Sequence, residues 1–202
     1  MRKWWKRLAV FALLAAALTY GAGLLKDHNL LEENLLRLHV VANSDTQADQ
    51  SVKLRVRDAV LNVLSDAMGA MPTLEEAKAY LQTHLPEIRQ AANTALKQAG
   101  SSLEAAVTLV KEAFPQRIYD TFRLPAGVYE TLRITIGQGE GKNWWCVLFP
   151  TLCVPASSAG FEAAAVSAGM PEDLSHTLSG QTPDIRFRLL DWLGEIKCWL
   201  NG

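Results

Sequence analysis

The sequence predicts an α+β fold, with a small antiparallel sheet of about four strands covered by two helices. Apolar residues alternate with a period of two in several short segments, which is typical of strands. Between the first of these segments and the others, apolar residues recur at helical spacing and mark helices with one apolar face. A signal or anchor helix at the N-terminus and an amphipathic helix at the C-terminus are expected to flank this domain.

The composition excludes several classes of function. The 202 residues suffice for one domain with a proper core and some additional segments. The formal net charge of −1 gives no basic footprint for nucleic acid. The four histidines are scattered along the chain and do not suggest a metal centre. No cofactor and no small-molecule substrate are expected.

Residues 1–26 are expected to form a signal peptide or a membrane anchor. Basic residues up to Arg7 precede an uncharged apolar run from Leu8 to Leu25. This order is typical of exported and membrane-anchored chains, whose basic end remains in the cytoplasm. A run of about 18 residues is near the lower limit for crossing a bilayer. Cleavage and retention of the segment both stay open, and an extracytoplasmic domain is predicted over residues 27–154.

The first strand is predicted over residues 36–42, where Leu36, Leu38 and Val40 form an apolar face. Val41 interrupts the opposite, polar face, so we expect that face to be partly covered as well. The sequence from Ser44 to Gln47 fits a capping box, in which the serine would cap the first helix.

A second capping box at Thr73–Glu76 opens a helix that runs toward Gly100, with Pro86 as a kink or a break. Alternating residues then predict strands near 105–110, 128–136 and 144–149. The last two are joined by a glycine-rich connection, which favours a hairpin.

The last part of the chain divides into two segments. Residues 155–183 are rich in Ala, Ser, Gly and Pro and are expected to be a flexible linker. Residues 184–202 are expected to form the amphipathic helix. Its polar face carries acidic as well as basic residues, whereas membrane-surface helices are usually more basic. Docking of this helix on the domain is therefore favoured over membrane binding.

A dense polar group marks the junction of the first strand and first helix. His39 and Asp45 are the minimum for general acid–base chemistry, but no serine or cysteine nucleophile is obviously placed. An envelope hydrolase that uses these two residues is the alternative hypothesis. The structural interpretation is that the histidine is hydrogen-bonded in a strand and that Ser44 and Asp45 cap the helix.

Aromatic and cysteine residues near position 150 are the other candidates. Trp144 and Trp145 are adjacent on a strand, so they must face opposite sides, and one of them needs a partner outside the helix-covered core. That partner is either the C-terminal helix or a second protein. A disulfide between Cys146 and Cys153 is plausible outside the cytoplasm and would leave Cys198 free.

Two long and unusual blocks carry a resemblance to a known family. They are RLHVVANSDTQADQSVKLRVRDAVL, residues 37–61, and LPAGVYETLRITIGQGEGKNWWCVLFPTLC, residues 124–153. From residue 34 to residue 154 the sequence closely resembles the stage II sporulation protein R family of endospore-forming bacteria. It departs from the family at Asp120 and Thr151, where the family usually has glycine and proline, and these departures affect only the expected loop shapes.

The resemblance implies a signalling role. Proteins of this family are made in the forespore and exported into the space between the two membranes. There they trigger a membrane-embedded aspartic protease of the mother cell, which processes the precursor of sigma-E. The resemblance thus implies a ligand and not an enzyme, held to the membrane only through its N-terminal segment if that segment is retained.

The expected contact with the protease lies on the block from Arg37 to Asp58, with aromatic residues of the later strand as anchors. Arg57 and Asp58 directly follow the apolar stripe at Val56, so they can edge an interface. The full set of expected partner-binding residues is Arg37, His39, Asn43, Ser44, Asp45, Asp49, Gln50, Lys53, Arg57, Asp58, Trp144, Trp145 and Phe149. A structural anchor protein, held to a membrane by its C-terminal helix, is a third hypothesis.

Overall fold

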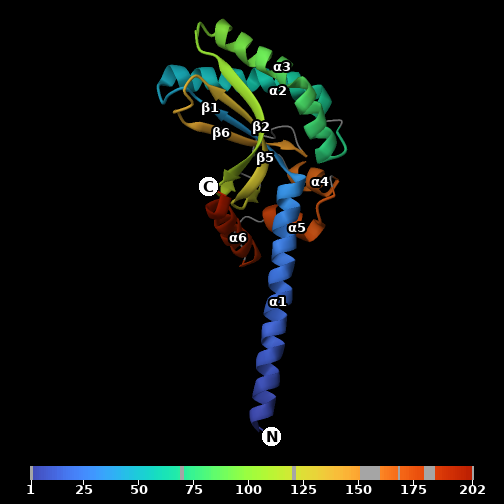
Figure 1. Cartoon of the computed structure of the whole chain (residues 1–202). Coiled ribbons are helices and arrows are strands. Elements are labelled where there is room, and N and C mark those ends of the chain that lie inside the picture. The colour runs from blue at the N-terminus through green and yellow to red at the C-terminus, as the bar shows by residue number, and fades with distance from the viewer. Residues whose placement is uncertain are drawn as a thin grey trace.

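The computed structural model describes residues 2–68, 71–119, 122–150, 160–167, 169–179 and 185–201 (Figure 1). The helices are α1 (Arg2–Asn34), α2 (Gln47–Met68), α3 (Leu74–Gln98), α4 (Gly160–Ser167), α5 (Glu172–Ser179) and α6 (Ile185–Asn201). The strands are β1 (Leu36–Val41), β2 (Ala105–Phe114), β3 (Arg117–Ile118), β4 (Arg123–Leu124), β5 (Gly127–Ile136) and β6 (Asn143–Phe149).

The predicted α+β class and the four-stranded sheet are confirmed, but the sheet is mixed. Its strand order is β2-β5-β1-β6. β1 runs parallel to β5 and antiparallel to β6, while β2 and β5 are antiparallel. The expectation of a purely antiparallel sheet is therefore wrong, because β1 joins the sheet next to a strand that runs in its own direction. β3 and β4 form a separate two-stranded sheet.

The predicted hairpin between β5 and β6 is wrong for the same reason, since β1 lies between these two strands. Their glycine-rich connection instead closes over the end of β1. The backbone N–H of Gly141 donates to Ala42 O at 2.9 Å, and that of Glu140 donates to Asn43 O at 3.2 Å. Gly137 has a φ of 55°, and a Cβ there would collide with the Asn43 side chain. Glycine in this connection, which has no side chain, allows its backbone to lie close to the end of β1.

One face of the sheet is covered by α2 and α3, which lie side by side in Figure 1. Leu36, Leu38 and Val40 of β1 are buried against apolar residues of these helices, as their alternation predicts. The capping box at Thr73 is confirmed, since its Oγ1 accepts from the Glu76 backbone N–H at 3.3 Å. α3 continues through Pro86 as a single helix.

The other face of the sheet is covered by a second apolar layer. It contains the end of α1 nearest the domain, α5, α6 and the small β3–β4 sheet, with Tyr129 and Phe187 among its buried side chains. Two helices, α4 and α5, lie in the segment expected to be a flexible linker, and Leu174 and Leu178 of α5 are buried. The small residues of this segment gave no helical pattern, so the sequence did not predict these two helices. Packing stabilises them more than helix propensity does.

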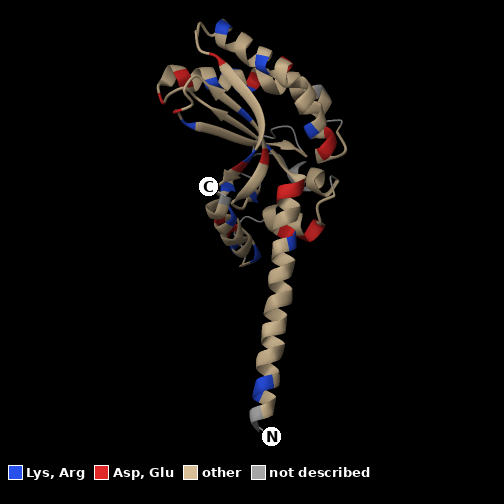
Figure 2. Cartoon of the chain, in the orientation of Figure 1, with Lys and Arg blue, Asp and Glu red and all other residues tan. Residues whose placement is uncertain are grey.

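α1 extends away from the domain as a long stem (Figure 1). Its apolar run is long enough to cross a membrane, and the stem carries no charged residue between Arg7 and Lys26 (Figure 2). The helix does not end at residue 26, where the signal or anchor segment was expected to end. It continues to Asn34, and Leu24, His28 and Leu31 of its last turns are buried in the second apolar layer.

Candidate functional site

The entrance of α2 is held by a network of short polar contacts. Thr46 caps the helix, because its Oγ1 accepts from the Asp49 backbone N–H at 3.2 Å and its carbonyl oxygen accepts from Gln50 N–H. The prediction of Ser44 as the cap is wrong by two residues. Ser44 Oγ instead donates to Asp49 Oδ2 at 2.5 Å, and Asn43 Nδ2 donates to the same oxygen at 2.9 Å. These bonds lower the pKa of the Asp49 carboxyl.

The remaining polar residues of this junction attach the glycine-rich connection between β5 and β6 to the start of α2. Asp45 Oδ1 accepts from the Lys142 backbone N–H at 2.7 Å. Lys53 Nζ donates to Lys142 O at 2.8 Å and to Gln50 Oε1 at 2.7 Å. Lys53 is buried, and the loss of solvent lowers its pKa. The density of polar groups that first suggested an active site therefore serves largely to clamp a loop.

Arg37 lies on the opposite face of β1 and is fully buried. Its guanidinium carbon lies 4.0 Å from the centre of the Phe114 ring, and its Nη2 donates to the Tyr119 hydroxyl at 2.8 Å. A buried cation over an aromatic face is stabilised by the ring quadrupole. Neither Phe114 nor Tyr119 carried a sequence signal, since both lie far from Arg37 in the chain and only the folded structure brings them to it.

His39 is paired with a carboxylate, but not with the one expected. Its Nδ1 lies 3.0 Å from Glu112 Oε2, whereas Asp45 bonds the glycine-rich connection. Arg133 Nη1 donates to the other Glu112 oxygen at 3.1 Å. The structure thus does not join His39 and Asp45 into an acid–base pair, and no observation supports the hydrolase hypothesis built on them.

The charge of Glu112 is fixed by its partners. Burial by itself would raise the pKa of this carboxyl. The hydrogen bond from His39 and the positive charges of His39, Arg133 and Arg37 outweigh burial and lower the pKa. Glu112 is therefore ionised at neutral pH, which suits a structural ion network better than a proton donor.

The two adjacent tryptophans of β6 face opposite sides of the sheet, as predicted. Trp144 packs against the core under α2 and α3, and the Arg57 guanidinium carbon lies 4.3 Å from its ring centre. Trp145 packs on the other layer, with Arg117 over its ring at 3.6 Å. Both rings are half-buried, whereas Phe149 is buried in the core.

The exposed part of the expected contact set is consequently small. The Asp58 side chain is 59% exposed and accepts from Arg57, which bridges it to Trp144. Asp45, Arg57, Asp58 and the rim of Trp144 form what we call the α2–β6 edge. Arg37, His39, Lys53 and Phe149 are too deeply buried to touch a partner directly.

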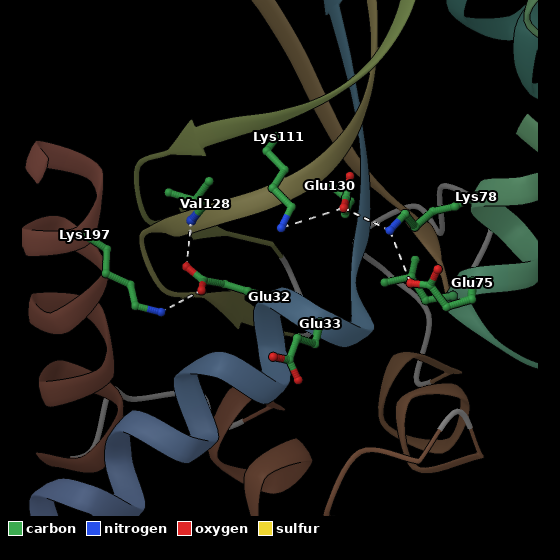
Figure 3. A pocket seen from close by; sticks show the side chains of 9 residues that line it. Glu32, Glu33, Glu75, Lys78, Lys111, Val128, Glu130 and Lys197 are labelled. Carbon is green, nitrogen blue, oxygen red and sulfur yellow. Dashed lines mark hydrogen bonds and ion pairs between the residues drawn. The ribbon is translucent and has the colours of Figure 1, made fainter. Parts of the chain in front are cut away.

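A polar pocket of about 400 Å³ lies elsewhere, where α1, α3, β5 and α6 meet (Figure 3). Glu32 Oε2 pairs with Lys197 at 2.7 Å, and Glu130 Oε1 pairs with Lys78 at 3.0 Å. Figure 3 shows that the first pair connects α6 to α1 and that the second connects α3 to β5. Glu32 and Glu130 are paired with lysines, so these contacts hold the layers together. Sequence patterns missed it, because its residues are far apart in the chain.

The described residues contain no group of three His, Cys, Asp or Glu side chains that could hold a metal ion. Cys146 is buried on β6 and takes part in a disulfide, and Cys198 is a free thiol. Cys153, the expected partner of Cys146, lies outside the described residues, so that pairing stays a prediction.

Comparison with known proteins identifies the family. The family model described as "Stage II sporulation protein R (spore_II_R)" matches residues 32–159. The stage II sporulation protein R of Bacillus subtilis (strain 168) is 36% identical over 153 residues, which covers 71% of this chain and 67% of that protein. No solved structure matches the chain. This chain therefore belongs to the stage II sporulation protein R family.

Proposed function

We propose that this protein is an exported sporulation signal that activates a membrane-embedded aspartic protease of the mother cell, leading to processing of pro-sigma-E. It acts by binding and not as an enzyme. Membership of the stage II sporulation protein R family supports the sporulation role. The apolar stem α1 supports export from the forespore into the intermembrane space. Whether the stem is retained or cleaved is decided by the mass of the exported protein.

The binding proposal rests on the contacts that the polar residues between Arg37 and Asp58 make in the structure. The central residues of this stretch are committed to loop clamping, helix capping and a buried ion network, as their partners indicate. Activation by binding requires that the ligand has a higher affinity for the active protease than for the resting one. The α2–β6 edge offers the groups that suit this: a charged pair beside an aromatic ring.

In this proposal the residues that hold the glycine-rich connection position the exposed groups of the α2–β6 edge. Lys53 and Asp45 hold the loop before β6, and Trp144 follows that loop by two residues. Arg57 then lies over the Trp144 ring. A partner that docks on this edge would therefore meet a preorganised surface, which lowers the entropic cost of binding.

The test is a reconstituted system that contains the full chain, the protease and the sigma precursor. The double variant Arg57→Glu/Asp58→Lys reverses both charges while keeping the pair and is expected to lower precursor cleavage about tenfold or more. The matched control is Arg89→Glu, an exposed charge reversal on α3, which should leave cleavage unchanged. Normal cleavage by a folded double variant would place the contact elsewhere.

A further inference from the structure

α6 docks on the domain mainly through residues outside the apolar face that its sequence predicts, and Leu189 and Leu193 are the members of that face that pack, partly buried, on the second apolar layer. Phe187 and Leu190 are buried in the second apolar layer, and Gly194 packs against Ala126. Asp191 Oδ1 accepts from the Ala126 backbone N–H at 2.8 Å. The helix is thus attached to the domain, while the stripe formed by the other apolar residues of its predicted face takes no part in this contact.

That apolar stripe is left in solvent. Trp192 is 58% exposed and Trp199 is 81% exposed, although tryptophan usually buries most of its surface. The exposed stripe consists of Ile185, Trp192, Ile196, Trp199 and Leu200. Its first four members recur at intervals of seven, four and three residues, so they lie on one side of the helix. A contiguous exposed apolar patch of this kind usually marks an interaction surface.

The position of α6 beside α1 indicates what covers the stripe. Arg186 Nη2 bonds Asp27 Oδ2 at 2.8 Å, and Lys197 Nζ bonds Asn29 Oδ1 at 2.7 Å. α6 is therefore attached to α1 just above the apolar stem, whose first buried residue is Leu24. The 18 uncharged residues from Leu8 to Leu25 would span roughly 27 Å, close to the thickness of the hydrocarbon core of a bilayer.

A bilayer crossed by this stem would therefore end within about one helical turn of Asp27, beside the first turn of α6. Tryptophan concentrates at this depth, because its ring is amphipathic. Arg188 lies exposed at the margin of the stripe and can extend its guanidinium toward the lipid headgroups. The stripe therefore begins at the layer where the stem leaves the bilayer, and its far end lies beside Asn29 and Glu32, within about two helical turns of that layer.

We infer that the exposed face of α6 binds the interfacial layer of the lipid bilayer that α1 enters. The inference rests on the proposed role of α1 as a membrane segment, and it deepens that role. α1 would cross the bilayer and α6 would bind its interfacial layer. These two points of attachment hold the domain in a fixed orientation, whereas α1 alone would leave it free to tilt. The α2–β6 edge would then be presented at a defined height above the membrane.

The test uses the full chain in phosphatidylcholine–phosphatidylglycerol vesicles, with and without bromine on the acyl chains near the headgroups. Bromine quenches tryptophan only on contact. The tryptophan fluorescence of the wild type minus that of the conservative variant Trp192→Phe/Trp199→Phe comes from the two tryptophans of α6 alone. This emission is expected to fall by about half in brominated vesicles, since an interfacial helix buries its apolar face roughly 5–10 Å deep.

Two control variants separate the possible failures. The variant Trp4→Phe/Trp5→Phe gives the emission of α1 by the same subtraction. The variant Trp144→Phe gives the emission of a tryptophan in the sheet, and bromine should not quench it. Quenching of the α1 emission without quenching of the α6 emission overturns the inference and leaves the anchor intact. Quenching of neither removes the anchor and the inference together. If the α6 emission is unquenched but shifts to the blue as protein concentration rises, a second copy covers the stripe, and the inference is wrong.

Discussion

Gly194 lies where α6 touches the chain just before β5, and its replacement by alanine is expected to destabilise the docked helix. A Cβ at this position would lie 1.6 Å from Ala126 O and 2.7 Å from His28 Nε2. The first obstacle is backbone, which cannot rotate away as a side chain can. Non-bonded carbon atoms need about 3.5 Å, so α6 would have to move outward by about 2 Å.

The size of the effect follows from what this movement disrupts. In a free helix, a change from glycine to alanine gains about 1 kcal/mol. Overpacking of a tight contact costs about 1–3 kcal/mol. An outward shift also weakens the bonds of Ala126 with Asp191 and His28, each of which contributes about 1 kcal/mol. We expect a net loss of about 2 kcal/mol in the free energy of unfolding for Gly194→Ala.

The measurement is urea unfolding of the full chain in a mild detergent, followed by circular dichroism. The matched control is Gly23→Ala, at a helical glycine of α1 where an added Cβ would meet no heavy atom within 4 Å. This control should be as stable as the wild type or slightly more stable. Equal stability of Gly194→Ala and the wild type would refute the close approach of α6 to Ala126.

Three further predictions concern the sheet and the entrance of α2. Thr46→Ala removes the α2 cap and is expected to lower the free energy of unfolding by about 1 kcal/mol, whereas Thr83→Ala within α3 should cost less in the same urea titration; equal losses would contradict the cap. Glu112 has a lowered pKa in the folded protein, so its charge stabilises the fold fully above the unfolded pKa of about 4.3, and this stabilisation is lost as the pH falls from that value through the lower pKa of the folded state. Glu112→Gln should therefore show a shallower loss of stability than the wild type as the pH falls from about 6 to about 3, and parallel curves would argue against the ion network. His39→Gln can keep a donor to Glu112 and is expected to leave cleavage of the sigma precursor unchanged; a folded His39→Gln variant that does not support cleavage would restore a chemical role for this residue.

Local sequence patterns were sufficient for the four strands of the main sheet and for α1, α2, α3 and α6, but not for β3, β4, α4 and α5. The alternation in β1 identified Leu36, Leu38 and Val40 as a core face, and the order of charge and apolar residues identified the α1 stem. The cap at Thr73 and the opposite faces of Trp144 and Trp145 also followed from spacing alone. These features depend on helix and strand periodicity and on hydrogen bonds between near neighbours, and all of these are encoded within a few residues.

The candidate site was only partly predictable. The sequence indicated the right stretch of polar residues, but assigned Ser44 a capping role that Thr46 fills, and paired His39 with Asp45 in place of Glu112. It also gave no sign of Tyr119 as the partner of Arg37. Glu112 comes to His39 through the sheet order and Tyr119 comes to Arg37 from the segment after β3, so tertiary folding rather than chain proximity sets these partners.

Sequence by itself determined the helices and strands of the main layers and most of their apolar faces, but not β3, β4, α4 or α5. Only the tertiary structure decided which strands pair, because backbone hydrogen bonds between strands are the same for any side chains and do not specify a partner. The insertion of β1 between β5 and β6 was decided at that level. So was the orientation of α6, where shape at Gly194 fixes the docked face and leaves the apolar stripe beside the stem exposed.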